Sequence, residues 1–314
     1  MDFVSIGIQV VFLIVGFVLL IKGADFFVDG SSNIASILKI PTLIVGLTIV
    51  ALGTSAPEAA VSITSSIAGS NELAVSNVIG SNLFNMLLII GLCALLNELK
   101  IGHDVLGKDL PFLVILTVIL TGIIFIGWNI SQIEGIILLI ILILYIAFLV
   151  YNAKNSKESE IVDEPKMSIL RSVIYIVGGI AGIVIGADFV VDSASFIAMA
   201  FGMSETLVGL TIVAIGTSLP ELVTSLTAMK KDQNQLVIGN VIGSNIFNIL
   251  FVLGASSAIT PIAINPNMII DILLMLGVTI LFFIFGKTQD KYDKREGFVL
   301  ISRSEERFSR NAET

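Results

Sequence analysis

Two stretches of this chain decide its fold: GLTIVALGTSAPEAAVSITSSIAGSNELAVSNVIGSNLFNMLLIIGL at residues 46–92, and GLTIVAIGTSLPELVTSLTAMKKDQNQLVIGNVIGSNIFNILFVLGA at residues 209–255. They align without a gap at an offset of 163, the difference between 209 and 46, and 25 of the 47 aligned residues are identical. The same offset places Asp25 over Asp188 and Asp29 over Asp192. A self-match at one fixed offset indicates an internal duplication, so we predict two similar halves.

The composition places both halves in a membrane. Apolar residues make up 55% of the 314 residues, charged residues only 13%, and the mean hydropathy is +1.01. Soluble domains average about 25% charged residues. The apolar runs are long and lack the two-residue period of a membrane β-barrel, so we predict an all-α membrane protein. The predicted spans are residues 3–22, 41–68, 73–96, 110–127, 131–151, 169–192, 204–229, 236–259 and 267–286.

The spans divide into two repeats of about five helices each. Residues 1–151 form the first repeat, 152–168 a charged linker, 169–301 the second repeat and 302–314 a polar tail. Because five is odd, the two repeats cross the membrane in opposite senses, which is typical of transporters with a binding site at the midplane. A tenth span should begin near Arg295, but its apolar run, residues 297–301, is short. We therefore expect a tenth helix cut short by truncation or a frameshift, and a tail that does not span.

The basic residues predict the orientation. From Lys22 to Arg295, all fourteen lysines and arginines fall in connections on one side of the predicted membrane. Positive residues favour the cytoplasm, so we expect an external N-terminus and a cytoplasmic 152–168 linker in a protein of the cell membrane. The lipid bilayer is an expected partner and nucleic acid is not, and we expect the chain to act as a monomer.

Each repeat carries one carboxylate in the middle of a span, Glu58 in the first and Glu221 in the second. A charge at the centre of a bilayer costs several kcal/mol, so such residues are usually functional. Pro57 and Pro220 precede them and interrupt helical hydrogen bonding. Backbone of this kind survives at membrane depth only where it is buried in protein or lines a cavity. The two glutamates are therefore the leading candidates for a binding site.

The next span of each repeat supplies neutral oxygens. Ser81 and Asn85, and their copies Ser244 and Asn248, lie four residues apart and so share a helix face. Glycines at positions 80 and 243 should permit close helix approach. Four further amides are equally compatible with ion ligation or with helix–helix hydrogen bonding: Asn77, Asn82, Asn240 and Asn245.

Every candidate ligand is a hard oxygen donor, which suits Ca²⁺ and Na⁺ better than Mg²⁺ and does not suit Zn²⁺. The chain has one cysteine, Cys93, and one histidine, His103, which argues against a metal site built from these residue types.

The paired motifs GTSAPE/GTSLPE and GSNLFN/GSNIFN resemble those of the sodium/calcium exchanger family of the cation/calcium antiporter superfamily, in its prokaryotic form. The resemblance implies ten helices in two inverted halves, with the first and sixth spans sliding as gates. It implies exchange of Na⁺ for Ca²⁺ by alternating access, without a cofactor and without enzymatic activity.

The resemblance also implies the ligands. It assigns the central Ca²⁺ site to Glu58 and Glu221 with the carbonyls of Thr54 and Thr217. It assigns the sodium sites to Ser55, Ser81, Ser218 and Ser244 with the carbonyls of Ala51 and Ala214, and it places Asn85 and Asn248 beside the centre. Relatives that co-transport K⁺ carry an aspartate in place of Asn248. The resemblance therefore implies K⁺-independent exchange, and a third Na⁺ would make that exchange electrogenic.

Two other functions are considered. A cation/proton exchanger would use the same glutamates as proton carriers. An intramembrane aspartyl protease would use Asp25 and Asp188, but an inverted repeat should place these two residues on opposite sides of the membrane.

Overall fold

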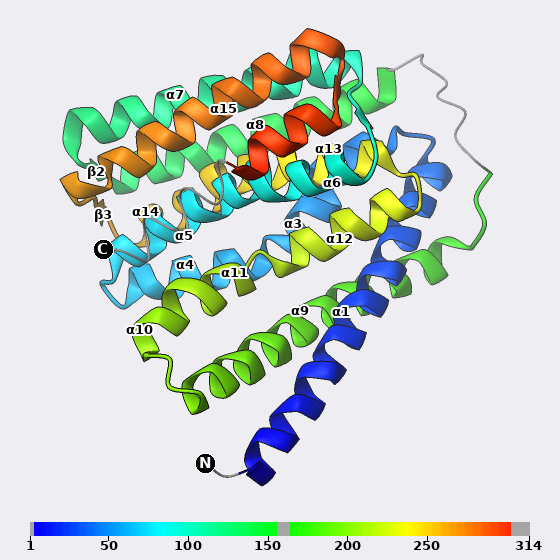
Figure 1. Ribbon diagram of the computed structural model, residues 1–314. Coiled ribbons are helices and arrows are strands. Elements are labelled where there is room, and N and C mark those ends of the chain that lie inside the picture. The colour runs from blue at the N-terminus through cyan, green and yellow to red at the C-terminus, as the bar shows by residue number, and fades with distance from the viewer. Residues whose placement is uncertain (1–2, 156–163, 303–314) are drawn as a thin grey trace.

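The computed structural model describes residues 3–155 and 164–302, and nearly all of these residues are helical (Figure 1). The α-helices are α1 (Phe3–Leu38), α2 (Thr42–Val45), α3 (Ala51–Thr54), α4 (Ala56–Ile67), α5 (Asn71–Phe84), α6 (Ile90–Leu96), α7 (Leu110–Gly127), α8 (Gln132–Asn155), α9 (Ile169–Ala200), α10 (Glu205–Val208), α11 (Ala214–Gly216), α12 (Leu219–Lys230), α13 (Asn234–Phe247), α14 (Gly254–Ile259) and α15 (Ile269–Gln289). The π-helical turns are η1 (Gly46–Val50), η2 (Asn85–Ile89), η3 (Val105–Asp109), η4 (Gly209–Val213) and η5 (Asn248–Leu253), and η6 (Pro266–Met268) is a 3₁₀ turn. The strands are β1 (Leu99–Lys100), β2 (Asn129–Ile130), β3 (Ile262–Ala263) and β4 (Lys291–Tyr292).

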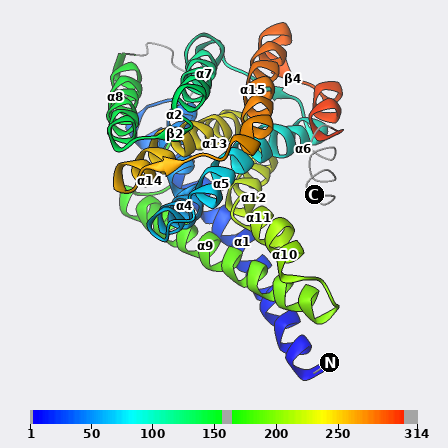
Figure 2. The same cartoon turned by 90° about the vertical axis from the view of Figure 1, so that its left-hand side faces the viewer.

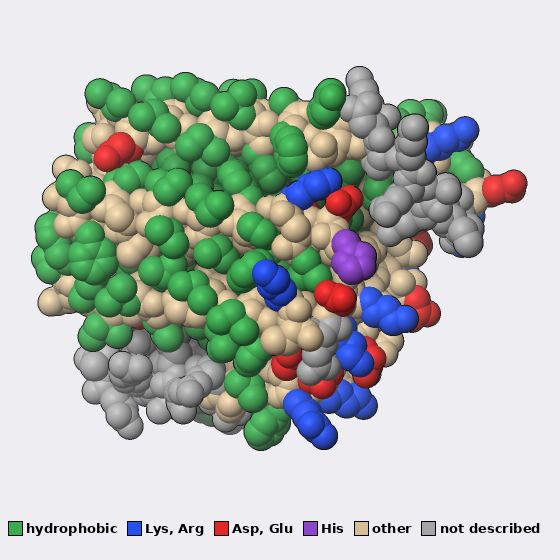
Figure 3. Space-filling view, turned by 90° about the horizontal axis from the view of Figure 1, so that it is seen from above, with side chains coloured by type: hydrophobic (Ala, Val, Ile, Leu, Met, Phe, Trp, Pro, Cys, Tyr) green, Lys and Arg blue, Asp and Glu red, His purple; other side chains and the backbone are tan. Residues whose placement is uncertain are grey.

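The helices form a membrane protein. Within the described residues, seven helices are long and apolar enough to cross a bilayer, and the bent pair Thr42–Thr54 and Ala56–Ile67 makes an eighth. The segment from α10 to α12 is the copy of that bent pair at the offset of the repeat. Figure 3 shows a broad apolar surface with charged side chains gathered at one end. This separation of charge from apolar surface is what a bilayer requires of a protein that crosses it.

Helices α1 and α9 are longer than their apolar runs predicted. We expected spans over 3–22 and 169–192, but α1 continues to Leu38 and α9 to Ala200. The first connection is therefore a short turn, and Lys22 lies on a helix, 3.7 Å from Asp25, rather than in a loop. Glycine and aspartate lower the hydropathy of residues 23–33 without ending the helix. Figure 2 shows the N-terminal part of α1 extending beyond the helices stacked above it.

A glycine seam joins α1 to α9. A Cβ on Gly23 would lie 2.8 Å from the carbonyl oxygen of Gly179, and one on Gly16 would lie 2.9 Å from that of Gly186. Residue numbers rise along α1 as they fall along α9, so the helices are antiparallel. Since α9 is the copy of α1, the two repeats are inverted, as predicted.

The most buried helices lie between two outer layers. The segments α5–η2–α6 and α13–η5–α14 form the centre, with α7, α8 and α15 on one side and α1 and α9 on the other (Figures 1 and 2). Residues from Leu236 to Leu250 are all buried. The segments with the repeated GSN motif therefore form the core of the protein.

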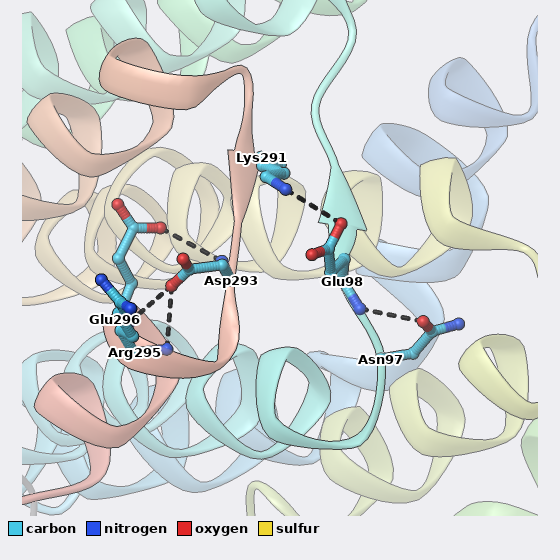
Figure 4. Close-up of polar contacts among 6 residues, drawn as sticks. All are labelled: Asn97, Glu98, Lys291, Asp293, Arg295 and Glu296. Atoms are coloured by element: carbon cyan, nitrogen blue, oxygen red, sulfur yellow. Dashed lines mark hydrogen bonds and ion pairs between the residues drawn. The ribbon is translucent and has the colours of Figure 1, made fainter.

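Short strand pairs tie the two repeats together at both ends. β1 pairs with β4, and β2 pairs with β3. After β2, the Ser131 backbone N–H donates to Glu134 at the start of α8 (2.7 Å). After β4, the Asp293 backbone N–H donates to Glu296 (3.2 Å), and Asp293 accepts the N–H groups of Glu296 and Arg295 (Figure 4). These N–H groups, that of Glu296 most of all, lower the pKa of the Asp293 carboxyl. Both turns are capping boxes, which begin helices.

The second capping box begins the tenth helix. Residues 294–302 are helical, and Gly297 approaches Gly91 as its counterpart Gly135 on α8 approaches Gly254. The short apolar run over 297–301 therefore lies in a helix that packs against the rest of the protein. This helix takes the position of the fifth helix of the second repeat. The predicted polar tail lies, apart from Ser302, outside the described residues.

The glycine seam predicts that alanine substitutions at two adjacent glycines affect the stability of the protein differently. A Cβ at Gly179 would lie 2.7 Å from the backbone nitrogen of Phe27, whereas one at Gly178 would meet no heavy atom within 4 Å. Gly179→Ala should lower the melting temperature of the detergent-solubilised protein, because overpacking against backbone costs about 1–3 kcal/mol. Gly178→Ala should leave it unchanged or raise it. Equal melting temperatures for the two variants would contradict the seam.

Candidate ion-binding site

The spans that carry the glutamates are broken at the predicted positions. Helices α3 and α4 meet at Ser55. The helical segment Thr42–Thr54 is bent there by 49° relative to Ala56–Ile67. Helix α12 begins after Ser218, which leaves helical geometry in the same way (φ −95°, ψ 5°). Pro57 and Pro220 lie in the first turns of α4 and α12, where the missing N–H group costs nothing.

Each break places its glutamate at a helix N-terminus. Glu58 lies in the first turn of α4 and Glu221 in the first turn of α12, and both side chains are fully buried. The N-terminal end of a helix carries a partial positive charge that favours an anion. The local fold therefore stabilises both carboxylates without a basic side chain.

The two carboxylates are held across the repeat boundary. Ser55 Oγ donates to Glu221 Oε1 at 2.9 Å, and Ser218 Oγ donates to Glu58 Oε1 at 3.2 Å. Each serine therefore contacts the glutamate of the other repeat. The two halves therefore meet at the glutamates, and the candidate ligands of both repeats belong to one cluster.

Two asparagines brace the broken helices. Asn77 Nδ2 donates to the carbonyl of Glu58 (3.3 Å), and Asn240 Nδ2 to the carbonyl of Glu221 (3.4 Å). Their side-chain oxygens accept hydrogen bonds from Thr217 (3.5 Å) and Thr54 (3.1 Å). These contacts satisfy the polar backbone beside each break. Asn77 and Asn240 thus act as hydrogen-bonding ties between helices.

The remaining predicted side chains surround the same centre. Ser81 Oγ lies 3.2 Å from Ser218 Oγ, and Ser244 Oγ lies 3.4 Å from Thr54 Oγ1. Asn85 and Asn248 are fully buried where the π-helical turns η2 and η5 begin. Turn η2 contacts α12, and η5 contacts α4, so each amide lies beside the glutamate helix of the other repeat.

Asn82 and Asn245 complete a second set of contacts across the boundary. Asn248 Nδ2 donates to Asn82 Oδ1, and Asn85 Nδ2 donates to Asn245 Oδ1, each at 3.0 Å. Asn82 and Asn245 therefore fix the rotamers of Asn248 and Asn85. The sequence left the role of both open, since an amide on a helix can face either an ion or a neighbouring helix.

Among the buried side-chain oxygens that have no hydrogen-bond partner within the described residues, four belong to the candidate site: Glu58 Oε2, Glu221 Oε2, Asn85 Oδ1 and Asn248 Oδ1. Buried acceptors are normally satisfied, and these four belong to the predicted ligands. Within the described ranges, no group of three or more His, Cys, Asp or Glu residues could hold a metal ion. A cation bound here would therefore meet two carboxylates and a set of neutral oxygens, which is chemistry that fits Ca²⁺ and Na⁺.

The two halves of the site differ in packing. Thr54 and Ala51 are fully buried, whereas Thr217 is half-buried and Ala214 is exposed. The carbonyl of Ala51 also accepts the backbone N–H of Ser55 (3.0 Å).

The two glycines that should permit close helix approach differ in their packing. Gly243 packs closely on Ala51, whereas a Cβ at Gly80 would meet no heavy atom within 4 Å. The two copies of the same motif are in different packing states.

The two membrane aspartates are far apart. Asp188 lies beyond Gly186, which faces Gly16 on α1, and Asp25 lies nine residues after Gly16, or about 14 Å along the helix. They cannot share one water, as a protease dyad must. Asp25 instead accepts an ion pair from Lys231 (3.5 Å), whose ammonium lies 2.7 Å from Asp29.

Inverted repeats with broken helices that meet at buried carboxylates define a secondary transporter. The chain matches the family described as sodium/calcium exchanger protein over residues 8–151 and 171–302. It is 37% identical to the inner membrane protein YrbG of Escherichia coli, with 86% of each chain covered, and 32% identical to the sodium/calcium exchanger MaX1 of Methanosarcina acetivorans, with 94% of this chain and 96% of the relative covered. A solved structure of the sodium-calcium exchanger NCX_Mj, soaked with Na⁺ and Sr²⁺, superposes with a TM-score of 0.84 at 30% identity, covering 94% of this chain and 95% of that one.

The chain therefore belongs to the sodium/calcium exchanger family. It is a sodium/calcium antiporter and not an enzyme, and these similarities indicate no cofactor. Neither the cation/proton exchanger nor the aspartyl protease is favoured by these similarities.

The cross-boundary contacts predict that each glutamate is required. Glu58→Gln or Glu221→Gln should abolish Ca²⁺ uptake into Na⁺-loaded vesicles, because one carboxylate cannot balance a desolvated divalent ion. Glu72→Gln, which removes an exposed carboxylate, should retain uptake. Near-normal uptake by either buried-site variant that elutes as a folded protein would exclude that glutamate from the site.

Proposed function

We propose that Na⁺ and Ca²⁺ are exchanged at one composite site between the two repeats. Glu58 and Glu221, with the carbonyls of Thr54 and Thr217, would hold Ca²⁺ at its centre. Flanking Na⁺ ions would bind the hydroxyls of Ser55, Ser81, Ser218 and Ser244 and the carbonyls of Ala51 and Ala214, with Asn85 and Asn248 beside the centre. The observation that carries this proposal is the two hydrogen bonds across the repeat boundary: Ser55 donates to Glu221, and Ser218 donates to Glu58.

The charge at this site favours electrogenic exchange. The hydrogen-bond partners of the two carboxylates are neutral, so the site contributes two negative charges. One Ca²⁺ or two Na⁺ would balance them. The unpaired oxygens of Asn85 and Asn248 could accept a third Na⁺ without adding charge. A carrier loaded with three Na⁺ would hold one more positive charge than a carrier loaded with Ca²⁺.

The residue at position 248 favours independence from K⁺. An aspartate there would add a third negative charge to balance a potassium ion, whereas Asn248 adds none. The site of this chain therefore offers no excess charge for a further cation.

Vesicle transport at fixed voltage tests the proposal. Ca²⁺ uptake into Na⁺-loaded vesicles should accelerate when the membrane potential is set positive inside, because net positive charge leaves with Na⁺, worth about 2.3 kcal/mol per charge per 100 mV. Adding K⁺ should leave the rate unchanged. Uptake indifferent to voltage, or absent without K⁺, would contradict the charge count.

The orientation and the boundaries of the repeats are part of the proposal. We place repeats at 1–151 and 169–301, joined by a cytoplasmic linker, in a cell-membrane protein that works as a monomer surrounded by lipid, with its N-terminus outside. The strand pairs support this, since β1 and β4 lie at the end rich in lysine, and β2 and β3 lie at the end that carries Glu134.

Thiol labelling tests the orientation. In a Cys93→Ala background, Glu72→Cys should react in intact cells with a membrane-impermeant thiol reagent, because Glu72 is exposed at the proposed outer end. Lys100→Cys, exposed at the other end, should react only after permeabilisation. The reverse pattern would invert the orientation.

A further inference from the structure

A groove separates α7 from α8, two helices that lie beside each other in Figure 2. Helix α7 packs mainly on α15, and α8 packs mainly on α14 and η5, so the surfaces that they turn toward each other are only partly covered. The groove has a volume of about 380 Å³, and its apolar wall is formed by Phe112 of α7 and by Ile141, Leu144 and Phe148 of α8. A space of this size can hold a small amphipathic molecule or part of a lipid.

The polar groups of the groove lie at one end of it. Lys108 and Asp109 line the groove where η3 leads into α7, at the end of the molecule that is rich in lysine. Helix α8 follows α7 after a short connection, so the two helices are antiparallel and Phe148 lies near this polar end. Ile141 precedes Phe148 by two helical turns, about 10 Å along the helix. The groove therefore suits a molecule with a polar end and an apolar chain, aligned as a lipid is aligned in that leaflet.

Asp109 is the buried acidic group of the groove. Its side chain accepts a hydrogen bond from the Tyr145 hydroxyl at 3.1 Å, and the residue is only 4% exposed. Within the part of the chain that the structure describes, no lysine or arginine forms an ion pair with Asp109, and the adjacent Lys108 pairs with Asp104 instead (2.9 Å). A buried carboxylate is costly unless a cation balances it. The groove therefore presents a negative charge that a bound cation would balance.

Asp109 is not part of the duplicated ion-binding machinery. Both glutamates of the candidate ion site recur at the offset of the repeat, whereas the copy of Asp109 at that offset is Ile272, which is fully buried. The copy of Lys108 is Asp271, so the charges of the groove are not reproduced in the second repeat. The acidic group and the lysine therefore serve a purpose that only the first repeat has.

A primary ammonium group would complete this site. A carboxylate accepts hydrogen bonds, so a cation with N–H donors fits Asp109 better than a quaternary ammonium group, which has none. Lys108 is exposed at the same end of the groove, and because an exposed ion pair contributes little, its pair with Asp104 leaves it able to bind a phosphate. A phospholipid with a primary ammonium headgroup supplies the cation, the phosphate and the apolar chain together.

We propose that the groove between α7 and α8 binds one phospholipid whose headgroup carries a primary ammonium. The ammonium pairs with Asp109, the phosphate meets Lys108, and an acyl chain lies along the apolar wall formed by Phe112 and Ile141. Charge complementarity selects this occupant, since a buried carboxylate and an exposed lysine lie at the same end of an apolar groove. The groove contains none of the proposed ion ligands, so the inference does not depend on the proposed function.

Lipid retention by the full chain is the first arm of the test. The detergent-solubilised protein is equilibrated with phosphatidylethanolamine, phosphatidylcholine and phosphatidylglycerol of identical acyl chains and is then analysed by native mass spectrometry. One phosphatidylethanolamine should be retained about tenfold more often than either of the other lipids, because only its headgroup donates a charge-assisted hydrogen bond to the carboxylate. Equal retention of the three lipids would overturn the proposal. A preference for phosphatidylglycerol would overturn it too, since that result is expected if Lys108 alone attracts an anionic headgroup.

Removal of the buried charge is the second arm. Asp109→Asn should retain phosphatidylethanolamine and phosphatidylcholine equally, because a neutral amide does not balance an ammonium group. Asp271→Asn is the matched control, since it removes a carboxylate from the first turn of α15, the corresponding helix of the second repeat, and it should keep the preference. A preference that persists in Asp109→Asn would show that the headgroup does not reach this carboxylate.

A pair of tryptophan variants tests the groove without changing a charge. Ile141→Trp should fill the groove and remove the retained lipid. Ile143→Trp adds the same side chain to α8 at a residue that is 66% exposed and lies outside the wall of the groove, so it should retain the lipid as the parent does. Undiminished retention by Ile141→Trp would overturn the proposal, whether or not Asp109→Asn folds.

Discussion

Two carboxylates buried inside a membrane-spanning protein are the constraint on which the rest of this structure depends. Within residues 3–155 and 164–302, neither Glu58 nor Glu221 has a basic partner, and each is stabilised by a helix N-terminus and by a serine from the opposite repeat. A helix N-terminus at membrane depth requires a broken helix, and the exposed backbone at the break requires further donors. The amides of Asn77 and Asn240 supply them.

This dependence explains why the site belongs to neither repeat alone. Each carboxylate is incomplete without a hydroxyl from the other half, and Asn85 and Asn248 are held by amides across the same boundary. A single repeat would leave a charge in an apolar environment with too few hydrogen bonds, which costs several kcal/mol. Duplication and inversion therefore solve a solvation problem for the two buried carboxylates.

The sequence predicted the parts of this structure that depend on residue chemistry. The repeat, the inversion, the helix breaks beside Pro57 and Pro220 and the contact of each glutamate with the other repeat are all present. The π-helical turns were missed because a one-residue widening of the helix has no distinct residue pattern. The length of α1 was missed because its polar stretch is stabilised by contact with another helix, which hydropathy does not record. The contrast between Gly80 and Gly243 could not be predicted, since identical motifs adopt two packing states and a sequence does not say which copy is in which.

The glycine seam between α1 and α9 has a consequence for leakage. Backbone contacts at Gly16, Gly23 and Gly179 leave little room for one helix to slide independently of the other. Helix α1 packs along α12 and touches η1, while α9 touches η4 and α11, so the joined pair reaches the broken helices of both repeats. A displacement that opens one route must carry the other helix with it. In a protein that alternates access between two sides, a pair joined in this way would act as an interlock, because neither helix could move to open one side without the other.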